Sequence, residues 1–320
     1  TILRHTGMDV RIGSLLPEVS KASTIDLPNG DSLILEPVQR KENRLVLENF
    51  DPCAVLLNND LSSGAPDILQ NLEQTVIPPV HAGWATRRKS SFFTAYDSVA
   101  KEFSDLIGID PWLINPYFGS CGEINFSEKK GEDCVAKNVD KILLQIREKY
   151  KKYDVQEEPF VIVKADAGTY GMGVMTVKSG EEVRKLNRKQ RNKMSVVKEG
   201  QPVTKVLVQE GVYTFESINA AVAEPVIYMI DRYVVGGFYR VHTGRGNDEN
   251  LNAPGMHFVP LSFEPSCLLP VNKTSRDYDA NRFYAYSVIA RLALLTAALE
   301  LEKGENEPID FVSKTSREKQ

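Results

Sequence analysis

Lys164 and the glycine-containing loop that follows it form the part of the chain best suited to chemistry. The lysine ends an apolar run, Val161–Val163, and a second apolar run, Val174–Val177, follows the loop. The loop glycines are Gly168, Gly171 and Gly173. β-Branched residues on both sides predict strands, and glycine lets backbone N–H groups approach a ligand closely. A lysine beside such a loop suits a polyphosphate. We therefore predict a hairpin that closes as a lid over nucleotide phosphates, with an ordinary glycine-turned hairpin as the alternative.

This hairpin differs from the common phosphate-binding loops. The GK[ST] sequence of a P-loop is absent, and a strand instead of a helix is expected after the glycines. The same order of elements argues against a dinucleotide-binding turn. The lid of a kinase or of an ATP-dependent ligase has the expected geometry.

Two later β-rich segments carry polar residues that could contact a nucleotide. The run Lys205–Val212 ends in Gln209 and Glu210, where exposed backbone groups could read adenine and a carboxylate could take the ribose hydroxyls. The runs Glu224–Ile230 and Tyr233–His242 are expected to form a hairpin, with Arg240 near its end. An arginine at a strand end can stabilise a phosphoryl group during transfer, although an exposed hairpin arginine is the simpler alternative.

The N-terminal part offers candidate metal and substrate ligands. An apolar segment, Cys53–Leu57, is expected to be a buried strand, and polar side chains follow it at Asn58–Asp60 and at Ser62 and Ser63. Amide and carboxylate oxygens suit Mg²⁺, and serine hydroxyls can hold a carboxylate. The alternative is a capped loop that enters a helix at Pro66. Arginine and lysine at 87–89 could bind an anionic amino acid or phosphate, or could form a solvated turn.

Composition limits the class of protein. The 320 residues are 42% hydrophobic and 26% charged, which is typical of a globular protein with two or three structural units. The net charge of −4 argues against nucleic acid as the main partner, and we interpret the basic run at 184–193 as a solvated helix. Four cysteines without CxxC spacing indicate a reducing cytosol. No apolar leader is visible, and the longest apolar stretch, 288–299, is too short to span a bilayer.

The elements expected to position these residues are of mixed type. Helical spacing of apolar residues predicts helices at 96–107, 137–150 and 281–302, and Asn29-Gly30 predicts a hairpin over 24–38. The fold class is therefore α+β or α/β. We expect an N-terminal α/β substrate and metal region over 1–155, a lid subdomain over 156–215 and a C-terminal subdomain over 216–320.

The order of these motifs resembles the ATP-grasp fold of glutathione synthetases and related carboxylate–amine ligases. The spellings VKADAGTYGMGV, VQEGV, FYRVH and NLNAPG are similar to those of the bacterial glutamate–cysteine ligase family of ATP-grasp type. The resemblance runs from about Asp51 onward and is strongest from Phe160 to Pro260. Each motif alone is weak, but the ordered set is fairly specific.

The resemblance implies roles for individual residues. Lys164 would hold the phosphates of ATP, and the loop Gly168–Gly173, with Tyr170, would cover them. Arg240 would stabilise the transferring phosphoryl group. The residues that would line the nucleotide are Gln209, Glu210, Val212, Glu224, Asn250 and Asn252. The residues expected near the amino-acid substrate are Ser62, Ser63, Arg87 and Arg245.

The resemblance also implies Mg²⁺ and a circular permutation. Most ATP-grasp proteins carry acidic magnesium ligands after the last helix, where this chain has only about twenty polar residues. The segment Leu57–Ser63 resembles an early Glu-x-Asn segment of permuted glutathione synthetases, although Leu57 stands in place of the glutamate. We therefore predict a permuted ATP-grasp fold with Asn59 and Asp60 as metal ligands and Asp166 in reserve.

The implied function is an ATP-dependent ligase that joins the γ-carboxylate of glutamate to the amine of cysteine through an acyl phosphate, the first step of glutathione biosynthesis. The implied partners are these small molecules and ATP with Mg²⁺, with no nucleic acid and no membrane, in a cytoplasmic protein that could form a homo-oligomer. The alternatives are another carboxylate–amine ligase, such as a glutathione synthetase, and a non-catalytic protein that binds nucleotides or nucleic acid.

Overall fold

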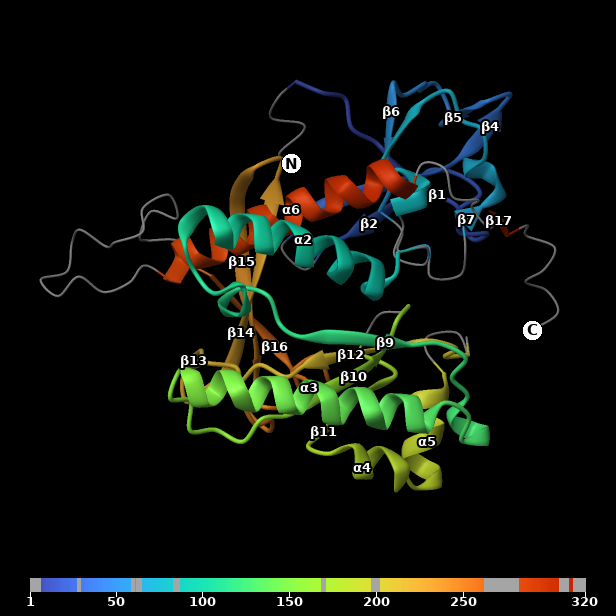
Figure 1. Cartoon of the computed structure of the whole chain (residues 1–320). Helices are drawn as coiled ribbons and strands as arrows, with labels where there is room; N and C mark the ends of the chain where they lie inside the picture. Colours follow the sequence, from blue (N-terminus) through green and yellow to red (C-terminus); the bar gives the residue numbers. More distant parts are fainter. Residues whose placement is uncertain are drawn as a thin grey trace, which may run out of the picture. The chain divides into compact units, whose positions relative to one another are not determined.

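A computed structural model of the chain describes residues 7–27, 30–58, 61, 65–82, 87–167, 171–196, 202–261, 282–304 and 311–312. The chain divides into two compact units, Thr1–Gly83 with Pro308–Gln320, and Trp84–Glu307. Figure 1 shows the elements of both units. The predicted region 1–155 spans the boundary between these two units, and the predicted boundaries at 155/156 and 215/216 stay predictions.

The first unit consists of short strands. A three-stranded sheet has the order β1-β3-β2, with β1 parallel and β2 antiparallel to β3. Three strand pairs accompany it: β4 with β5, β6 with β8, and β7 with β17. The bounds are β1 Ile12–Ser14, β2 Ser23–Asp26, β3 Ser32–Pro37, β4 Gln39–Lys41, β5 Arg44–Val46, β6 Ala54–Leu56, β7 Ala65–Pro66, β8 Thr75–Ile77 and β17 Phe311–Val312, with single 3₁₀ turns at Asp67–Leu69 and Val80–Ala82.

Two predictions in this unit can be compared with the structure. The hairpin expected over 24–38 is confirmed, because β2 and β3 pair antiparallel. The segment expected to be a buried strand is a strand, β6, but the prediction of its burial was wrong. Leu56 is 65% exposed, because β6 pairs only with β8 and none of its three residues is fully buried. The alternative interpretation, a capped loop that enters a helix at Pro66, does not hold either, because strand β7 and a single 3₁₀ turn occupy this segment.

The second unit is built around two antiparallel sheets. One has the order β11-β10-β12-β9 and carries the glycine hairpin. Its strands are β9 Phe118–Cys121, β10 Val161–Ala165, β11 Val174–Val177 and β12 Val206–Glu210. Figure 1 shows α3 along one side of this sheet, with α4 and α5 near it. These helices are α3 Glu132–Lys152, α4 Gly180–Arg184 and α5 Arg188–Ser195, and 3₁₀ turns lie at Pro111–Leu113 and Phe126–Glu128.

The alternation of side chains along β10 decides which residues reach the core. Val161, Val163 and Ala165 are buried in a cluster with apolar residues of α3, such as Val139 and Ile146. Successive strand residues point to opposite faces, so Ile162 and Lys164 lie on the face away from α3. The strand thus presents a lysine on an apolar surface.

The other sheet has the order β13-β14-β15-β16. Its strands are β13 Ser217–Ile218, β14 Ala221–Ile230, β15 Tyr233–His242 and β16 His257–Pro260. One face packs against α6, Arg282–Gly304, through Tyr239, Val241 and Phe283. Glu224 and Arg240 are cross-strand partners on the opposite face. The predicted β14–β15 hairpin is therefore confirmed.

The helices are longer or more divided than the sequence predicts. The helix expected from residue 96 begins at Lys89 and forms α2, Lys89–Ile107. The run expected to be one lid helix forms α4 and α5, because the Asn187 side chain caps the second helix. The sheet of the glycine hairpin includes β9 and packs against α3, and both elements precede the predicted boundary at 155.

Helix α6 extends well beyond the apolar stretch 288–299 that the sequence analysis judged too short to span a bilayer. Residues Arg282–Lys303 form 22 residues with a mean hydropathy of 1.4, long and apolar enough to cross a membrane by length and composition alone. The prediction that no segment is long enough was therefore wrong. Such a helix is weak evidence for a membrane span, and α6 packs through Leu292 against Tyr96 and Ala100 of α2.

Candidate functional site

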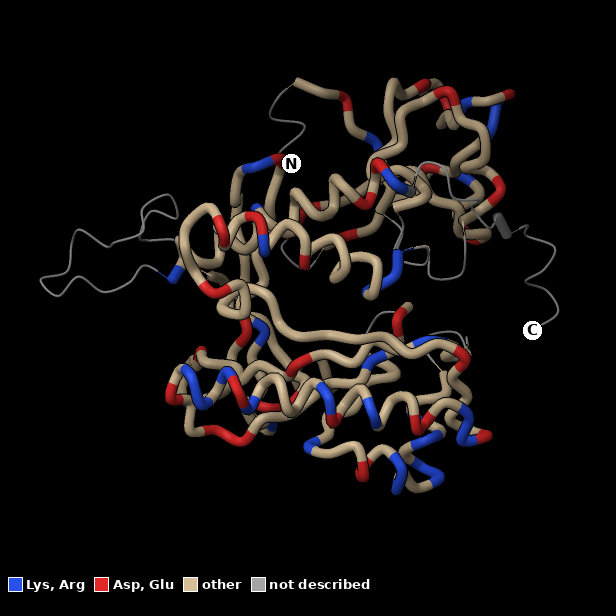
Figure 2. The backbone as a smooth tube through the Cα atoms, in the orientation of Figure 1, with Lys and Arg blue, Asp and Glu red and all other residues tan. Residues whose placement is uncertain are grey.

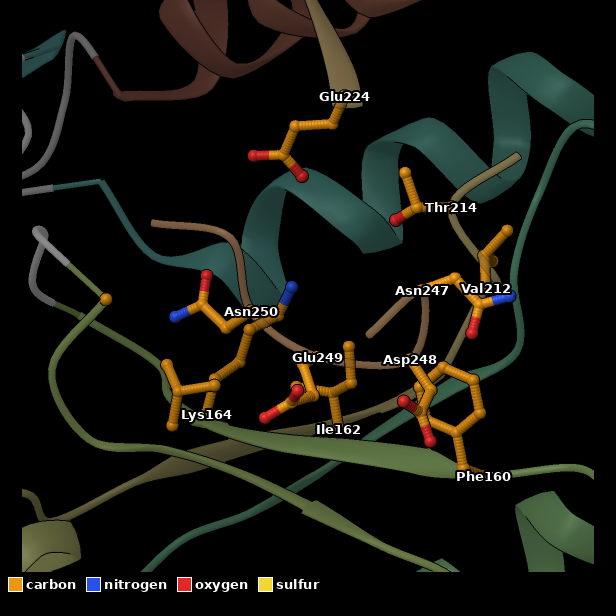
Figure 3. Close-up of a pocket in the computed structure, with 12 residues that line it drawn as sticks. Phe160, Ile162, Lys164, Val212, Thr214, Glu224, Asn247, Asp248, Glu249 and Asn250 are labelled. Atoms are coloured by element: carbon orange, nitrogen blue, oxygen red, sulfur yellow. The ribbon is translucent and has the colours of Figure 1, made fainter. Parts of the chain in front are cut away.

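A cavity of about 220 Å³ lies in the second unit, between residues of both sheets and of two loops. The lining residues are Phe160, Ile162, Lys164, Gly171, Val174, Val212, Thr214, Glu224, Asn247, Asp248, Glu249 and Asn250. Figure 3 shows Lys164 and Asn250 near one end of the cavity, and Phe160 with Val212 near the other. The cavity therefore has a polar, cationic end and a more apolar end.

Lys164 is the cation of the cavity. Burial and, as the smaller cause, the charge of Lys89 together lower the pKa of Lys164 to about 8. The ammonium nitrogen lies 5.5 Å from the centre of the Phe93 ring, which comes from the first turns of α2. A half-desolvated ammonium is costly without an anion, so this end of the cavity is suited to a negatively charged ligand.

The loop 245–252 gives the cavity a set of polar groups with fixed directions. Glu249 accepts hydrogen bonds from Arg245 Nη1 at 2.6 Å and from the Gly246 amide at 2.8 Å. These bonds hold the pKa of Glu249 below its usual value. Asn250 Oδ1 accepts from the Asn252 amide at 3.0 Å. Because Oδ1 accepts this bond, the Nδ2 donor of Asn250 points away from the Asn252 amide.

Gly171 brings the lid against this loop. Its φ of +69° is in the left-handed region, and an added Cβ would lie 2.8 Å from Asn252 O and 2.9 Å from Asn250 Nδ2. Only glycine fits this approach without a shift. The carbonyl of Gly173 accepts from the Ala165 amide at 2.8 Å and closes the hairpin. The predicted strand–glycine loop–strand hairpin is thus present, with β10 and β11 antiparallel.

Arg240 and Glu224 form an ion pair between β14 and β15. Glu224 lines the cavity. Among the described residues, Arg240 Nε is buried and has no hydrogen-bond partner. A buried guanidinium N–H without a partner costs free energy, but Arg240 itself is not among the residues that line the cavity.

Glu210 does not face the cavity, which corrects the expectation that its carboxylate meets the nucleotide. It is 4% exposed and accepts from Trp112 Nε1 at 2.9 Å and from the Tyr117 amide at 2.9 Å. Burial raises its pKa. Glu210 pairs with Val161 on β10, so it shares the core face of the sheet. Gln209 lies on the other face but is not among the residues that line the cavity.

Asp166 caps a helix, which corrects its expected role as a reserve metal ligand. The side chain is 1% exposed and accepts from the amide and the hydroxyl of Ser90, at 2.7 and 2.8 Å. Lys205 Nζ lies 3.5 Å from the same carboxylate. These donors fix the start of α2 against the end of β10 and use the oxygens that a metal would need.

The other predicted ligands are partly outside the described residues. Arg87 forms an ion pair with Glu300, and Arg245 pairs with Glu249, so each has a protein partner in the second unit. Asn252 contacts Gly171 through its backbone oxygen. The residues outside the described ranges are Asn59, Asp60, Ser62, Ser63, Gly168 and Tyr170, and their predicted roles stay predictions.

The sequence analysis missed several lining residues. Ile162 could have been found from the strand period, since it is two residues from Lys164 on the same face. The polar stretch Asn247–Glu249 gave no signal beyond its hydrophilicity. In the described part of the chain, no group of three His, Cys, Asp or Glu side chains is arranged to hold a metal ion.

The fold and the cavity define a class of protein, namely a mixed α/β protein with a cavity suited to a small anionic ligand, lined by a glycine hairpin and a polar loop. A family model described as GshA, glutamate-cysteine ligase, matches residues 1–301. The chain therefore belongs to the glutamate–cysteine ligase family. The predicted family, the predicted ligase function and the enzyme class, an ATP-dependent ligase, are thereby confirmed.

Two solved structures are similar to the chain. One, named "Putative gamma-glutamylcysteine synthetase", comes from Methylobacillus flagellatus KT. It is 64% identical, with a TM-score of 0.85, over 94% of this chain and 71% of the other. The second is D-alanyl-alanine synthetase A from Vibrio cholerae O1 biovar eltor str. N16961, at 12% identity and a TM-score of 0.40, over 89% of this chain and 72% of the other. A similarity as low as the second carries no inference. A comparison with curated protein sequences gives no match.

Proposed function

We propose that the cavity around Lys164 is the ATP site of this glutamate–cysteine ligase and that the chain has the ATP-grasp fold in a circularly permuted form. The observation that carries the proposal is a half-buried lysine with a lowered pKa, at the polar end of a cavity covered by a glycine hairpin. The permuted order of elements rests on the resemblance of the motifs.

The chemistry requires cations and a dry site more than a protein nucleophile. A carboxylate does not react with an amine in water, because its leaving group would be oxide. Transfer of the γ-phosphoryl group of ATP to the glutamate carboxylate gives an acyl phosphate and ADP. The cysteine amine then attacks the acyl carbon, and phosphate leaves. Fixed positive charges stabilise both steps electrostatically.

Lys164 and Arg240 would supply these charges. Lys164 holds its ammonium in a partly desolvated place, where its attraction to phosphate is stronger than in water. Arg240 would exchange part of its pairing with Glu224 for the phosphoryl group and would donate through its partnerless Nε. Asn250 Nδ2 and the amides of the loop Gly168–Gly173, with Tyr170, would donate to the remaining phosphate oxygens.

The apolar end of the cavity fits a nucleobase. Phe160 and Val212 line it, with Ile162 between them and Lys164, and apolar side chains favour burial of a flat heterocycle. The strand end at Gln209 would offer backbone groups to the adenine edge. Figure 3 shows Phe160 and Val212 away from Lys164, so a nucleotide with its base at this end would direct its phosphates toward Lys164.

Magnesium is compatible with the residues of the cavity. Mg²⁺ in such sites is held by one or two carboxylates together with substrate phosphates and water. Glu224 and Asp248 line the cavity with carboxylate oxygens, whereas both oxygens of Glu249 already accept hydrogen bonds. Figure 3 places Asp248 beside Phe160, at the end away from Lys164, so Glu224 is the residue that would hold the ion, which would supply charge neutralisation of the phosphates when bound.

The remaining parts of the proposal concern partners. Glutamate and cysteine would be the small-molecule substrates, with Arg87 and Arg245 near the amino acids. A cytoplasmic location follows from the pathway that the family serves. Figure 2 shows acidic residues interspersed with the lysines and arginines of α3 and α4. Arg184 and Lys185 of the basic run pair with carboxylates, including Asp133 and Glu181, which does not favour a nucleic-acid surface.

The first test is ADP release with Mg-ATP and glutamate, with and without cysteine. We expect turnover only when both amino acids are present, with γ-glutamylcysteine as product. Turnover that requires γ-glutamylcysteine and glycine instead would indicate a glutathione synthetase. Lys164→Met should reduce kcat/KM for ATP by about 10²–10³-fold, the range for one lost electrostatic donor. Lys141→Met, on the exposed side of α3, is the control and should match the wild type.

A further inference from the structure

The loop between β15 and β16 contributes four of the cavity residues, Asn247–Asn250, and its shape therefore matters for any ligand. We infer that His242 is a positioning residue for the ligase reaction, which holds both ends of this loop so that Asn250 faces the nucleotide phosphates. The inference rests on the proposed ATP site.

His242 bridges the two ends of the loop through its ring. The side chain belongs to the last residue of β15 and the residue is 8% exposed. Its Nδ1 accepts from the Gly244 amide at 3.1 Å, and its Nε2 lies 3.0 Å from Pro254 O. Because an amide can only donate, Nδ1 carries no proton. Nε2 is therefore protonated and donates to the Pro254 carbonyl.

The surroundings of the ring leave little space for another arrangement. Gly255 has a φ of +98°, and an added Cβ there would lie 3.3 Å from His242 Nε2. An added Cβ at Gly244 would lie 3.6 Å from the ring carbon Cε1. The histidine is thus held between two glycines, one at each end of the loop, and it joins residues ten positions apart.

The middle of the loop is ordered from these two ends. The Thr214 amide donates to Asn247 O at 2.7 Å, and Leu251 is 0% exposed. The bond from the Asn252 amide to Asn250 Oδ1 then fixes the direction of Asn250 Nδ2. Strands β15 and β16 pair directly at Val241 and His257, and the Thr214 bond ties Asn247 to a distant segment. The two bonds of the His242 ring add a link across the loop itself, from Gly244 to Pro254. Without it, the loop can shift relative to Gly171 and the cavity.

The expected effect is a loss in nucleotide binding and positioning. A displacement of about 1 Å in a positioning group can lower a rate about 10²-fold. We expect His242→Ala to raise KM for Mg-ATP at least tenfold, while KM for glutamate changes by less than threefold. A histidine with only a structural role would lower the thermal midpoint and alter both constants together.

Conservative variants separate positioning from folding. His242→Asn keeps an acceptor for the Gly244 amide, and His242→Gln keeps a donor for Pro254 O. We expect at least one of them to return KM for Mg-ATP to within threefold of the wild type, although neither retains the imidazole. His257→Ala, an exposed histidine on β16, is the matched control and should leave both constants unchanged.

The experiment measures kcat, KM for ATP and KM for glutamate in these variants and in Lys164→Met, with circular dichroism and urea midpoints for each. An unchanged KM for ATP in His242→Ala overturns the inference, as does an equal rise for both substrates or a failure of both conservative variants to recover. If Lys164→Met is strongly impaired and His242→Ala is not, the ATP site stands and only the role of His242 is lost. If neither variant is impaired, both proposals fail.

Discussion

The lowered pKa of Lys164 leads to a specific pH dependence of nucleotide binding. Burial is the larger cause of the shift to about 8, and the charge of Lys89 is the second. The protonated form is the one that attracts phosphate. Binding should therefore be constant below about pH 8 and should weaken as the pH rises through that value, because a neutral amine gains little from an anion.

The size of the effect follows from the titration. With a pKa of about 8, about nine tenths of Lys164 is charged at pH 7 and about one tenth at pH 9. The Kd for Mg-ADP should therefore rise about tenfold between these values, which corresponds to about 1.4 kcal/mol. At pH 8 about half of the lysine is neutral, so binding should take up as much as about half a proton.

The assay is isothermal titration with Mg-ADP from pH 7 to pH 9, in two buffers with different heats of ionisation to count protons. ADP is used because it binds without turnover and because the amino-acid substrates, whose amines also titrate, can be left out. Lys164→Arg keeps a charge throughout this range, so its Kd should be flat. Lys89→Met removes the neighbouring charge, so the midpoint should move above pH 8.

Two results would refute the reasoning. A wild-type Kd that is flat between pH 7 and pH 9 would mean that Lys164 does not contact the phosphates or that its pKa is not lowered. A pH dependence that persists in Lys164→Arg would assign the titration to another group. If the midpoint of Lys89→Met is unchanged, the charge of Lys89 does not contribute to the lowered pKa of Lys164, and burial remains as the cause.

Asp166, Gly171 and Asp110 offer three further tests. Asp166→Ala removes both acceptors of Ser90, so we expect the free energy of unfolding in urea to fall by about 2–4 kcal/mol. The half-saturating Mg²⁺ concentration of the ligase assay should stay unchanged. A large rise in that concentration would indicate that Asp166 is a metal ligand after all. Gly171→Ala places Cβ 2.8 Å from Asn252 O at a positive φ, so KM for ATP should rise at least fivefold, and an unchanged KM would show that the lid does not need this contact. Two lysines of α3 hold the pKa of Asp110 well below its usual value, so the charged form stabilises the folded state above the unfolded-state pKa of about 4. The difference in urea midpoint between wild type and Asp110→Asn should therefore shrink as the pH falls from about 5 to about 2, and a constant difference would contradict it.

Much of the local structure near the site could be predicted from the sequence. β-Branched residues on both sides of the glycines gave the strands β10 and β11, and Lys164 was placed at the end of the first. The hairpin of β14 and β15 followed from two apolar runs with a short polar break. These predictions succeeded because they depend on neighbours in the sequence, on backbone sterics and on a period of two.

The direction of individual side chains was harder to predict from the sequence. Glu210 was expected at the nucleotide because it ends a strand, but its pairing with Val161 puts it on the core face with Trp112. Asp166 was expected near a metal because it follows the lysine, but it accepts a hydrogen bond from Ser90, which lies 76 residues earlier in the sequence, in the first turn of α2. Both errors arose from partners that are distant in the chain.

The sequence alone determined that the chain has a lysine, a glycine hairpin and a later arginine in the order of a glutamate–cysteine ligase. The tertiary structure decided which of the neighbouring polar residues meet in one cavity, and it alone brought Gly171 against Asn250 and His242 against Pro254. The physical reason is that the period of a strand fixes which residues share a face, whereas the pairing of distant segments fixes which face is covered by a core and which is left open to a ligand.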